Sequence, residues 1–301
     1  MTTCAGCGRK ISGSYIQAMD RTWHSECFKC AGCGKPFGST SFVLEAGKPF
    51  HAACHTRQFA PKCAVCGGAL AGSYRMDDWG AAYHAEHNLP RCTSCGRLIC
   101  PSITRGGVRY GDGREVCNLC RRTAVDDAAA AQRVWIEICR DLSAMGIDLR
   151  TAGVPVRLTT APDLARLGAK TQASRPVGLT RTRTATMNGV ESSRRVEEIL
   201  TLVGLPRDQL GQVLAHEAVH AWLFLTRCPA LEPRCEEGLA ELVSWLWLDG
   251  RRTAEADHWR AAIASNDDPI YGAGFREARQ SYERAGLAAV LRGVRERRRL
   301  P

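Results

Sequence analysis

Apolar residues recur at helical spacing in three segments of the chain after residue 125. Residues 126–146 predict a connecting helix, with Gly146 as the glycine that ends it. Residues 208–226 predict a long helix capped by Asp208, and residues 234–249 predict another after a proline-bearing loop. The buried face of this last helix is expected to contain Leu239, Leu242, Val243 and Leu246.

The sequence between these helices contains segments that favour β-strands. Residues 154–158 form a short β-branched stretch. Residues 196–203 fit a strand or a helical turn about equally well, and the Gly204-Leu205-Pro206 sequence that follows favours the strand. Residues 164–195 are polar and rich in Thr and Arg, which is compatible with a long loop or with a hairpin.

Composition narrows the class of protein. The 301 residues are 45% apolar and 24% charged, which is an ordinary globular composition for two or three folded units. Because no apolar run is long enough to span a membrane and the N-terminus has no signal pattern, we expect a cytoplasmic protein without a membrane partner. In a reducing compartment, sixteen cysteines favour metal thiolates over disulfides.

Metal-ligand residues are concentrated in the first part of the chain, and the expected division follows from this. We predict an α+β protein with a zinc-ribbon domain over residues 1–58 and a degenerate copy over 59–122. After these two domains we predict a connecting helix over residues 123–150 and a mainly helical catalytic domain over residues 151–301.

Cysteine and histidine pairs with two-residue gaps follow one another at the start of the chain. They are Cys4 and Cys7, His24 and Cys27, Cys30 and Cys33, and His51 and Cys54. Zinc takes four such donors in a tetrahedron. The succession resembles the LIM domain, a pair of fused zinc ribbons. By that resemblance, one zinc is held by Cys4, Cys7, His24 and Cys27, and the next by Cys30, Cys33, His51 and Cys54.

A second block repeats the scheme in a degenerate form. One quartet is Cys63, Cys66, His84 and His87, and the other is Cys92, Cys95, Cys117 and Cys120. Redox Cys-x-x-Cys pairs are the alternative, but such pairs occur singly rather than alternating with histidines in fours. The remaining cysteines, Cys100, Cys139, Cys228 and Cys235, are expected to be small buried apolar residues. His55 could compete as a ligand, but the register favours His51.

An HExxH motif lies inside the helix predicted from residue 208. Helical spacing places His216 and His220 on one face, so that they can bind one zinc while Glu217 reaches its water. A third donor must follow, and Leu223 excludes the metzincin pattern. In the next helix, Glu237 is favoured over Glu236 as this third zinc ligand.

A residue that orients a zinc histidine is also expected in that helix. Glu241 shares a face with Glu237 and is the candidate. The alternative is a pair of amphipathic helices whose histidines and carboxylates bind no metal. Burying two histidines and two glutamates beside apolar side chains would then be costly, because no metal would neutralise them.

The whole chain resembles the plant LIM-domain peptidases of organ-size control, which are activated through ubiquitin. The resemblance rests on the LIM domain and its degenerate copy, on the Leu214-Ala215-His216-Glu217 run, on Glu236-Glu237-Gly238, and on the segment 268–276. It implies a gluzincin metallopeptidase, a hydrolase with Glu237 as third zinc ligand, with four structural zincs and one catalytic zinc.

One departure from that family and one motif that the chain lacks change the expectations. The plant members carry ubiquitin-interacting motifs before the LIM domain, whereas here the first ligand is already Cys4, so ubiquitin dependence stays open. The chain also lacks a Gly-x-Met-Glu-Asn run that anchors a free amine in aminopeptidases, which favours an endopeptidase acting on proteins.

The roles expected at the catalytic site follow from zinc-peptidase chemistry. Glu217 is expected to take a proton from the attacking water, with Tyr271 as candidate oxyanion donor and Arg276 as a weaker one. The LIM modules would recognise a substrate or a regulatory protein. A non-enzymatic LIM adaptor is the alternative. The formal net charge of +10 suggests nucleic acid, but no recognition-helix spacing supports that partner.

Overall fold

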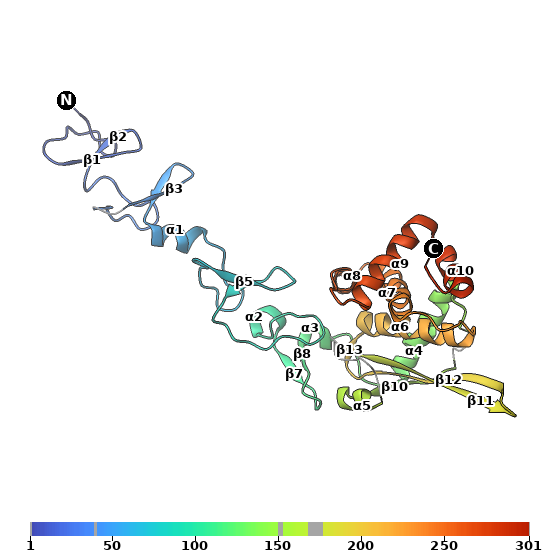
Figure 1. Cartoon of the computed structure of the whole chain (residues 1–301). Helices are drawn as coiled ribbons and strands as arrows, with labels where there is room; N and C mark the ends of the chain where they lie inside the picture. Colours follow the sequence, from blue (N-terminus) through green and yellow to red (C-terminus); the bar gives the residue numbers. More distant parts are fainter. Residues whose placement is uncertain (1, 39–40, 150–152, 168–176, 301) are drawn as a thin grey trace. The chain divides into compact units, whose positions relative to one another are not determined.

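The computed structural model describes residues 2–38, 41–149, 153–167 and 177–300 (Figure 1). Contacts divide the chain into two compact units. The first comprises Met1–Pro90 and Gly96–Gly106, and the second comprises Arg91–Cys95 and Gly107–Pro301. These units are defined by contacts and not by motifs, so the domain ranges given above stay a prediction.

The first unit is built from short antiparallel hairpins. Its elements are β1 (Tyr15–Ala18), β2 (Arg21–His24), β3 (Val43–Glu45), β4 (Lys48–Phe50), α1 (Ala52–Phe59), β5 (Tyr74–Met76), β6 (Ala82–His84) and α2 (Pro101–Thr104). Strands β1 and β2, β3 and β4, and β5 and β6 pair in two-stranded sheets. His24 and His84 end their strands and His51 follows β4, so each hairpin delivers a predicted ligand.

Apolar clusters in the first unit are small. One contains Phe28, Phe37 and Phe50, and another surrounds Tyr83 and Leu98. Isolated two-stranded hairpins with so few buried side chains are marginal in water. Metal binding is therefore expected to supply much of the folding free energy of this unit.

The second unit begins with a further hairpin and then becomes largely helical. Its strands are β7 (Gly107–Arg109), β8 (Glu115–Cys117), β9 (Ala124–Val125), β10 (Val156–Thr159), β11 (Gly178–Met187), β12 (Val190–Leu202) and β13 (Leu205–Pro206). Its helices are α3 (Asn118–Arg121), α4 (Ala128–Ala144), α5 (Ala161–Arg166), α6 (Arg207–Leu225), α7 (Pro233–Asp249), α8 (Ala254–Ala264), α9 (Tyr271–Ala285) and α10 (Leu287–Arg297). The predicted α+β class is confirmed.

A three-stranded sheet of order β10-β12-β11 supports the helices of this unit. Strand β10 is parallel to β12, whereas β11 is antiparallel to it. Figure 1 shows helices α6 to α10 on one side of the sheet. The strand interpretation of residues 196–203 is confirmed, and the hairpin is the alternative that residues 178–195 adopt. Part of the polar segment, residues 168–176, lies outside the described residues.

The core of the second unit lies between α4, α6, α7 and the sheet. Trp135, Ile138 and Leu142 of α4 are fully buried. Asp127 caps α4 by accepting a hydrogen bond from the Ala130 N–H, and Gly146 follows it with a φ of 90°. The apolar spacing and the terminal glycine thus predicted the limits of this helix to within two residues at each end.

Some local predictions were wrong. Asp208 does not cap α6, since Pro206 occupies the cap position and the Asp208 carboxylate instead accepts from Arg251 and Thr253. Leu246 is only half-buried, because α7 buries Trp247 and Leu248 instead.

The four cysteines outside the quartets divide in burial. Cys100 and Cys235 are buried as expected. Cys139 and Cys228 are only partly buried, so the prediction of small buried residues was wrong for these two.

Candidate metal centres

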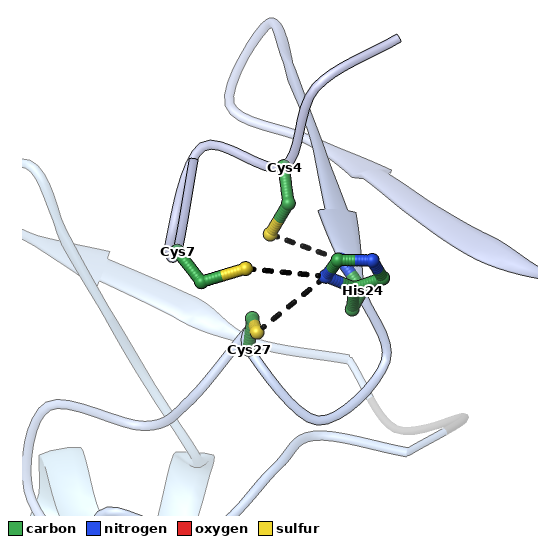
Figure 2. A group of neighbouring side chains, drawn as sticks. All are labelled: Cys4, Cys7, His24 and Cys27. Atoms are coloured by element: carbon green, nitrogen blue, oxygen red, sulfur yellow. Dashed lines mark hydrogen bonds between the residues drawn. The ribbon is translucent and has the colours of Figure 1, made fainter. Parts of the chain in front are cut away.

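Four quartets of cysteine and histidine side chains converge as the spacing predicts. The first is Cys4, Cys7, His24 and Cys27, in which the sulfurs of Cys7 and Cys27 lie 3.4 and 3.7 Å from His24 Nδ1 (Figure 2). A tetrahedral zinc with ordinary bond lengths separates a sulfur and a nitrogen ligand by about 3.5 Å. The donor set and its spacing therefore fit zinc.

The second quartet repeats this geometry. It consists of Cys30, Cys33, His51 and Cys54, with Cys33 Sγ 3.4 Å from His51 Nδ1. In both quartets the first cysteine accepts two backbone N–H groups, at 3.3 and 3.4 Å for Cys4 and at 3.3 Å for both donors to Cys30. Burial alone would raise the pKa of Cys4, but these donors lower it to about 6, which favours the thiolate.

The degenerate block also brings its donors together. Cys63, Cys66, His84 and His87 form the third quartet, with Cys66 Sγ 3.5 Å from His84 Nδ1. His55 pairs instead with Glu45 at 2.9 Å, which agrees with the preference for His51 as ligand.

The fourth quartet lies in the second unit and contains only cysteines. Its members are Cys92, Cys95, Cys117 and Cys120, all of them buried. Sulfur–sulfur distances are 3.8 Å between Cys92 and Cys120 and 3.7 Å between Cys95 and Cys117. Zinc–thiolate bonds predict about 3.8 Å for this separation in a tetrahedron. This site therefore also fits structural zinc.

A fifth cluster joins helices α6 and α7. His220 Nε2 lies 3.2 Å from His216 Nε2, and Glu237 Oε2 lies 3.1 Å from His216 Nε2 and 3.5 Å from His220 Nε2. Nitrogen and oxygen ligands of a tetrahedral zinc are about 3.3 Å apart. The three donors thus form a triangle of the right size, as the motif and the choice of Glu237 predicted.

Each histidine of the fifth cluster also contacts a carboxylate through its other ring nitrogen. Glu241 lies 3.3 Å from His216 Nδ1, as expected from its shared face with Glu237. Glu236 lies 2.9 Å from His220 Nδ1. The sequence interpretation favoured Glu237 over Glu236 as ligand and did not anticipate this contact, which arises because the α6–α7 crossing brings His220 to the flank of α7 that carries Glu236.

Glu217 is 7% exposed and is oriented by strand β11. Thr180 Oγ1 donates to Glu217 Oε2 at 2.7 Å and also contacts the Glu217 carbonyl at 3.0 Å. Gly178 leaves the room for this approach, because a Cβ there would lie 2.6 Å from Glu217 Oε1. Sequence reasoning missed Thr180, since it lies in the polar segment to which no function was assigned.

Tyr271 approaches the cluster from helix α9. Its ring stacks on that of His216, with centroids 6.3 Å apart and an interplanar angle of 24°. Tyr271 is the first residue of α9. Arg276 donates to the carbonyl of Asn266 at 2.8 Å.

Two glycines permit the helix crossing that brings Tyr271 close. A Cβ at Gly238 of α7 would lie 2.3 Å from the backbone of Gly274 in α9, and one at Gly274 would lie 2.3 Å from the Arg234 carbonyl oxygen. Any side chain at either position would separate the two helices. The glycines therefore determine how near Tyr271 stands to Glu237.

Charges within the fifth cluster are strongly coupled. Burial would lower the pKa of His220, but contacts with Glu236 and Glu237 raise it to about 9. The pKa of His216 is likewise raised by Glu237 and Glu241 against the effect of burial. Burial would raise the pKa of Glu237, and the two histidines lower it instead. Without metal, the cluster is therefore an ion-paired network.

Zinc uptake by this cluster is expected to release protons. Both histidine pKa values lie above their value of about 6.5 in an unfolded chain, so protonation stabilises the metal-free fold below that pH. This contribution is lost as the pH rises through about 9. Zinc requires neutral imidazoles, so its affinity should increase with pH up to that value. Calorimetry at pH 7 in buffers of different ionisation enthalpy should give about two protons per zinc at this centre, and none would contradict the network.

Replacing Glu236 should weaken metal binding at the fifth cluster. Glu236→Ala removes the carboxylate that orients His220, and such partners are worth about tenfold to a hundredfold in metal affinity. Competition with a chromophoric chelator measures this. Glu232→Ala removes the same charge from an exposed side chain that makes no cap hydrogen bond, and it should leave the affinity unchanged. Equal affinities for the two variants would mean that Glu236 does not orient the ligand.

Comparisons with known proteins agree with the resemblance seen in the sequence. Residues 4–59 match the LIM domain family, and residues 169–265 match the family described as DA1-like, Protein DA1. The chain is 29% identical to Protein DA1 of Arabidopsis thaliana, with 99% of this chain and 68% of the relative aligned. It is 28% identical to Protein DA1-related 1 of the same plant, over 97% and 65% of the two chains.

A rice protein extends the comparison. The LIM domain-containing protein HDR3 of Oryza sativa subsp. japonica is 26% identical over 97% of this chain and 72% of its own length. The chain thus spans about two thirds of the length of these relatives. The predicted resemblance is confirmed, and so is an N-terminal LIM domain with zinc-binding sites. No helix among the described residues is long and apolar enough to cross a membrane.

Proposed function

We propose that this chain is a zinc-dependent endopeptidase of the gluzincin type. The observation that carries the proposal is the triangle of His216 Nε2, His220 Nε2 and Glu237 Oε2, with edges of 3.1, 3.2 and 3.5 Å. Three protein donors leave one position of a tetrahedral zinc for water or substrate, which is typical of catalytic rather than structural sites. The four thiolate-containing quartets have no such position.

In this proposal, Glu217 is the general base and general acid. Zinc, when bound, would supply Lewis-acid activation of water and of the scissile carbonyl. Glu217 takes the proton of the attacking water and returns it to the leaving amine. Thr180 holds one carboxylate oxygen at 2.7 Å, so the base enters the reaction already oriented.

Tyr271 is proposed to stabilise the charge that develops on the carbonyl oxygen. Burial, together with the nearby Glu237 and Glu241, raises the pKa of Tyr271 to about 12. Its hydroxyl therefore remains protonated at neutral pH and can donate a hydrogen bond. A donor fixed beside the metal stabilises the transition state more than the planar substrate.

The substrate class that fits best is protein. The LIM domain and its degenerate copy contain no spare acid–base residue in any quartet, so we assign them to recognition of a substrate or a regulatory protein. Ubiquitin is one candidate regulator. Nucleic acid is not proposed as a partner, and a cytoplasmic location remains part of the proposal.

Zinc content distinguishes this enzyme from a LIM adaptor with a peptidase-like scaffold. The purified full chain should contain about five zincs, one for each cluster in the described residues. His216→Ala should contain about four and should lose cleavage of a protein mixture followed by mass spectrometry. Four zincs in the unaltered protein, with no cleavage, would support the adaptor instead.

A further inference from the structure

A cavity of about 410 Å³ lies on the second unit, away from the metal cluster. It is an open cavity that lies between the C-terminal ends of α4 and α6 and one face of α10. Residues 288, 291, 292, 295 and 296 of α10 line it at helical spacing. Trp222 lies two residues after His220 on α6, so the cavity and the metal occupy opposite sides of the same helix.

The lining combines an apolar floor with a basic rim. Trp222 and Leu291 are 4% and 6% exposed, and Met145 is half-buried beside them. Arg292 and Arg295 are exposed at the rim. A cavity of this size that combines buried apolar side chains with charged groups at its rim has the character of a binding site.

The two rim arginines have no acidic partner in the part of the chain that the structure describes. Arg227, which also lines the cavity, is paired with Glu191 at 3.0 Å. Arg295 instead lies over the Trp222 ring, 5.8 Å from its centroid. Only one carboxylate, that of Glu296, shares the lining, so the cavity is basic overall. Its charge is complementary to an anionic ligand.

We infer that this cavity, the α6–α10 pocket, binds a peptide segment of a partner protein in which a large apolar side chain is flanked by acidic residues. The apolar side chain contacts Trp222 and Leu291, and the flanking carboxylates pair with Arg292 and Arg295. Buried tryptophan and arginine are the residues that most often dominate such interfaces. The exposed rim lets a peptide continue beyond the pocket on either side.

Binding at this pocket is independent of the proposed peptidase chemistry, so it can be tested without cleavage. The probe is a fluorescein-labelled hexapeptide, Asp-Glu-Phe-Leu-Asp-Glu, titrated with the zinc-loaded full chain carrying Glu217→Gln. Fluorescence anisotropy should give saturable binding. Arg295→Glu and Ala288→Phe, which reverse a rim charge and fill the pocket, should each weaken it by about tenfold or more.

Matched controls separate the pocket from general charge attraction. Arg297→Glu makes the same charge change on α10 at an exposed position outside the lining, and it should leave the affinity within about twofold. The peptide Asp-Glu-Ser-Ser-Asp-Glu should not bind. Far-ultraviolet circular dichroism and zinc content verify that each variant is folded.

Several outcomes would overturn the proposal. They are absence of binding below about 1 mM, equal weakening by Arg295→Glu and Arg297→Glu, or equal binding of the serine peptide. Insensitivity to both pocket variants would place the peptide outside the α6–α10 pocket and would likewise reject the proposal.

Discussion

Glu217→Gln should reduce cleavage of a protein substrate by about a thousandfold while the zinc content stays unchanged. Glutamine has almost the same shape as glutamate, and its amide can still accept the hydrogen bond that Thr180 donates at 2.7 Å. It cannot take a proton from water. The proposed metal ligands are His216 and His220 on the same helix and Glu237 on another, so their triangle should survive the substitution.

Two measurements check this prediction together. Initial rates of substrate cleavage give the loss of activity, and elemental analysis gives the zinc content of the same samples. Glu232→Gln, at an exposed position of the α7 cap, should retain both. Loss of the fifth zinc in Glu217→Gln would assign the residue a structural role, and full activity would reject it as the base.

The convergence of the candidate metal donors could be predicted from sequence because their spacing is local. Cys-x-x-Cys pairs and the HExxH motif fix donors within one turn, so backbone geometry alone brings them together. The prediction of Glu237 as the third donor required only the assumption that the next helix packs against the helix that carries the HExxH motif. All five clusters are found in the structure at distances that fit zinc.

The residues that sequence reasoning missed depend on tertiary contacts. Thr180 lies on β11, far from Glu217 in sequence, and no motif joins them. Glu236 was disfavoured as the zinc ligand by its position on α7, but the angle between two helices decides which flank a histidine reaches. Asp208 illustrates the same limit, since its carboxylate accepts from Arg251 and Thr253 instead of capping α6.

Gly238→Ala should destabilise the second unit by about 3 kcal/mol. In an exposed helix, alanine is more favourable than glycine by about 1 kcal/mol, so propensity alone predicts the opposite sign. Here the added Cβ would lie 2.3 Å from the backbone carbon and oxygen of Gly274, which cannot move like a flexible side chain. Steric repulsion should therefore exceed propensity and push α9, with Tyr271, away from Glu237.

Urea unfolding of the zinc-loaded protein, followed by tryptophan fluorescence, measures the stability change. Gly250→Ala is the matched control at the end of the same helix, because a Cβ there would meet only the Trp247 carbonyl oxygen at 3.5 Å. Its effect should lie within about 0.5 kcal/mol. Gly238→Ala should also lower the cleavage rate in urea-free buffer, where the protein remains folded, because Tyr271 is displaced. If Gly238→Ala were as stable as the unaltered chain, the close α7–α9 crossing would be wrong, and the assignment of Tyr271 as oxyanion donor would lose its structural basis.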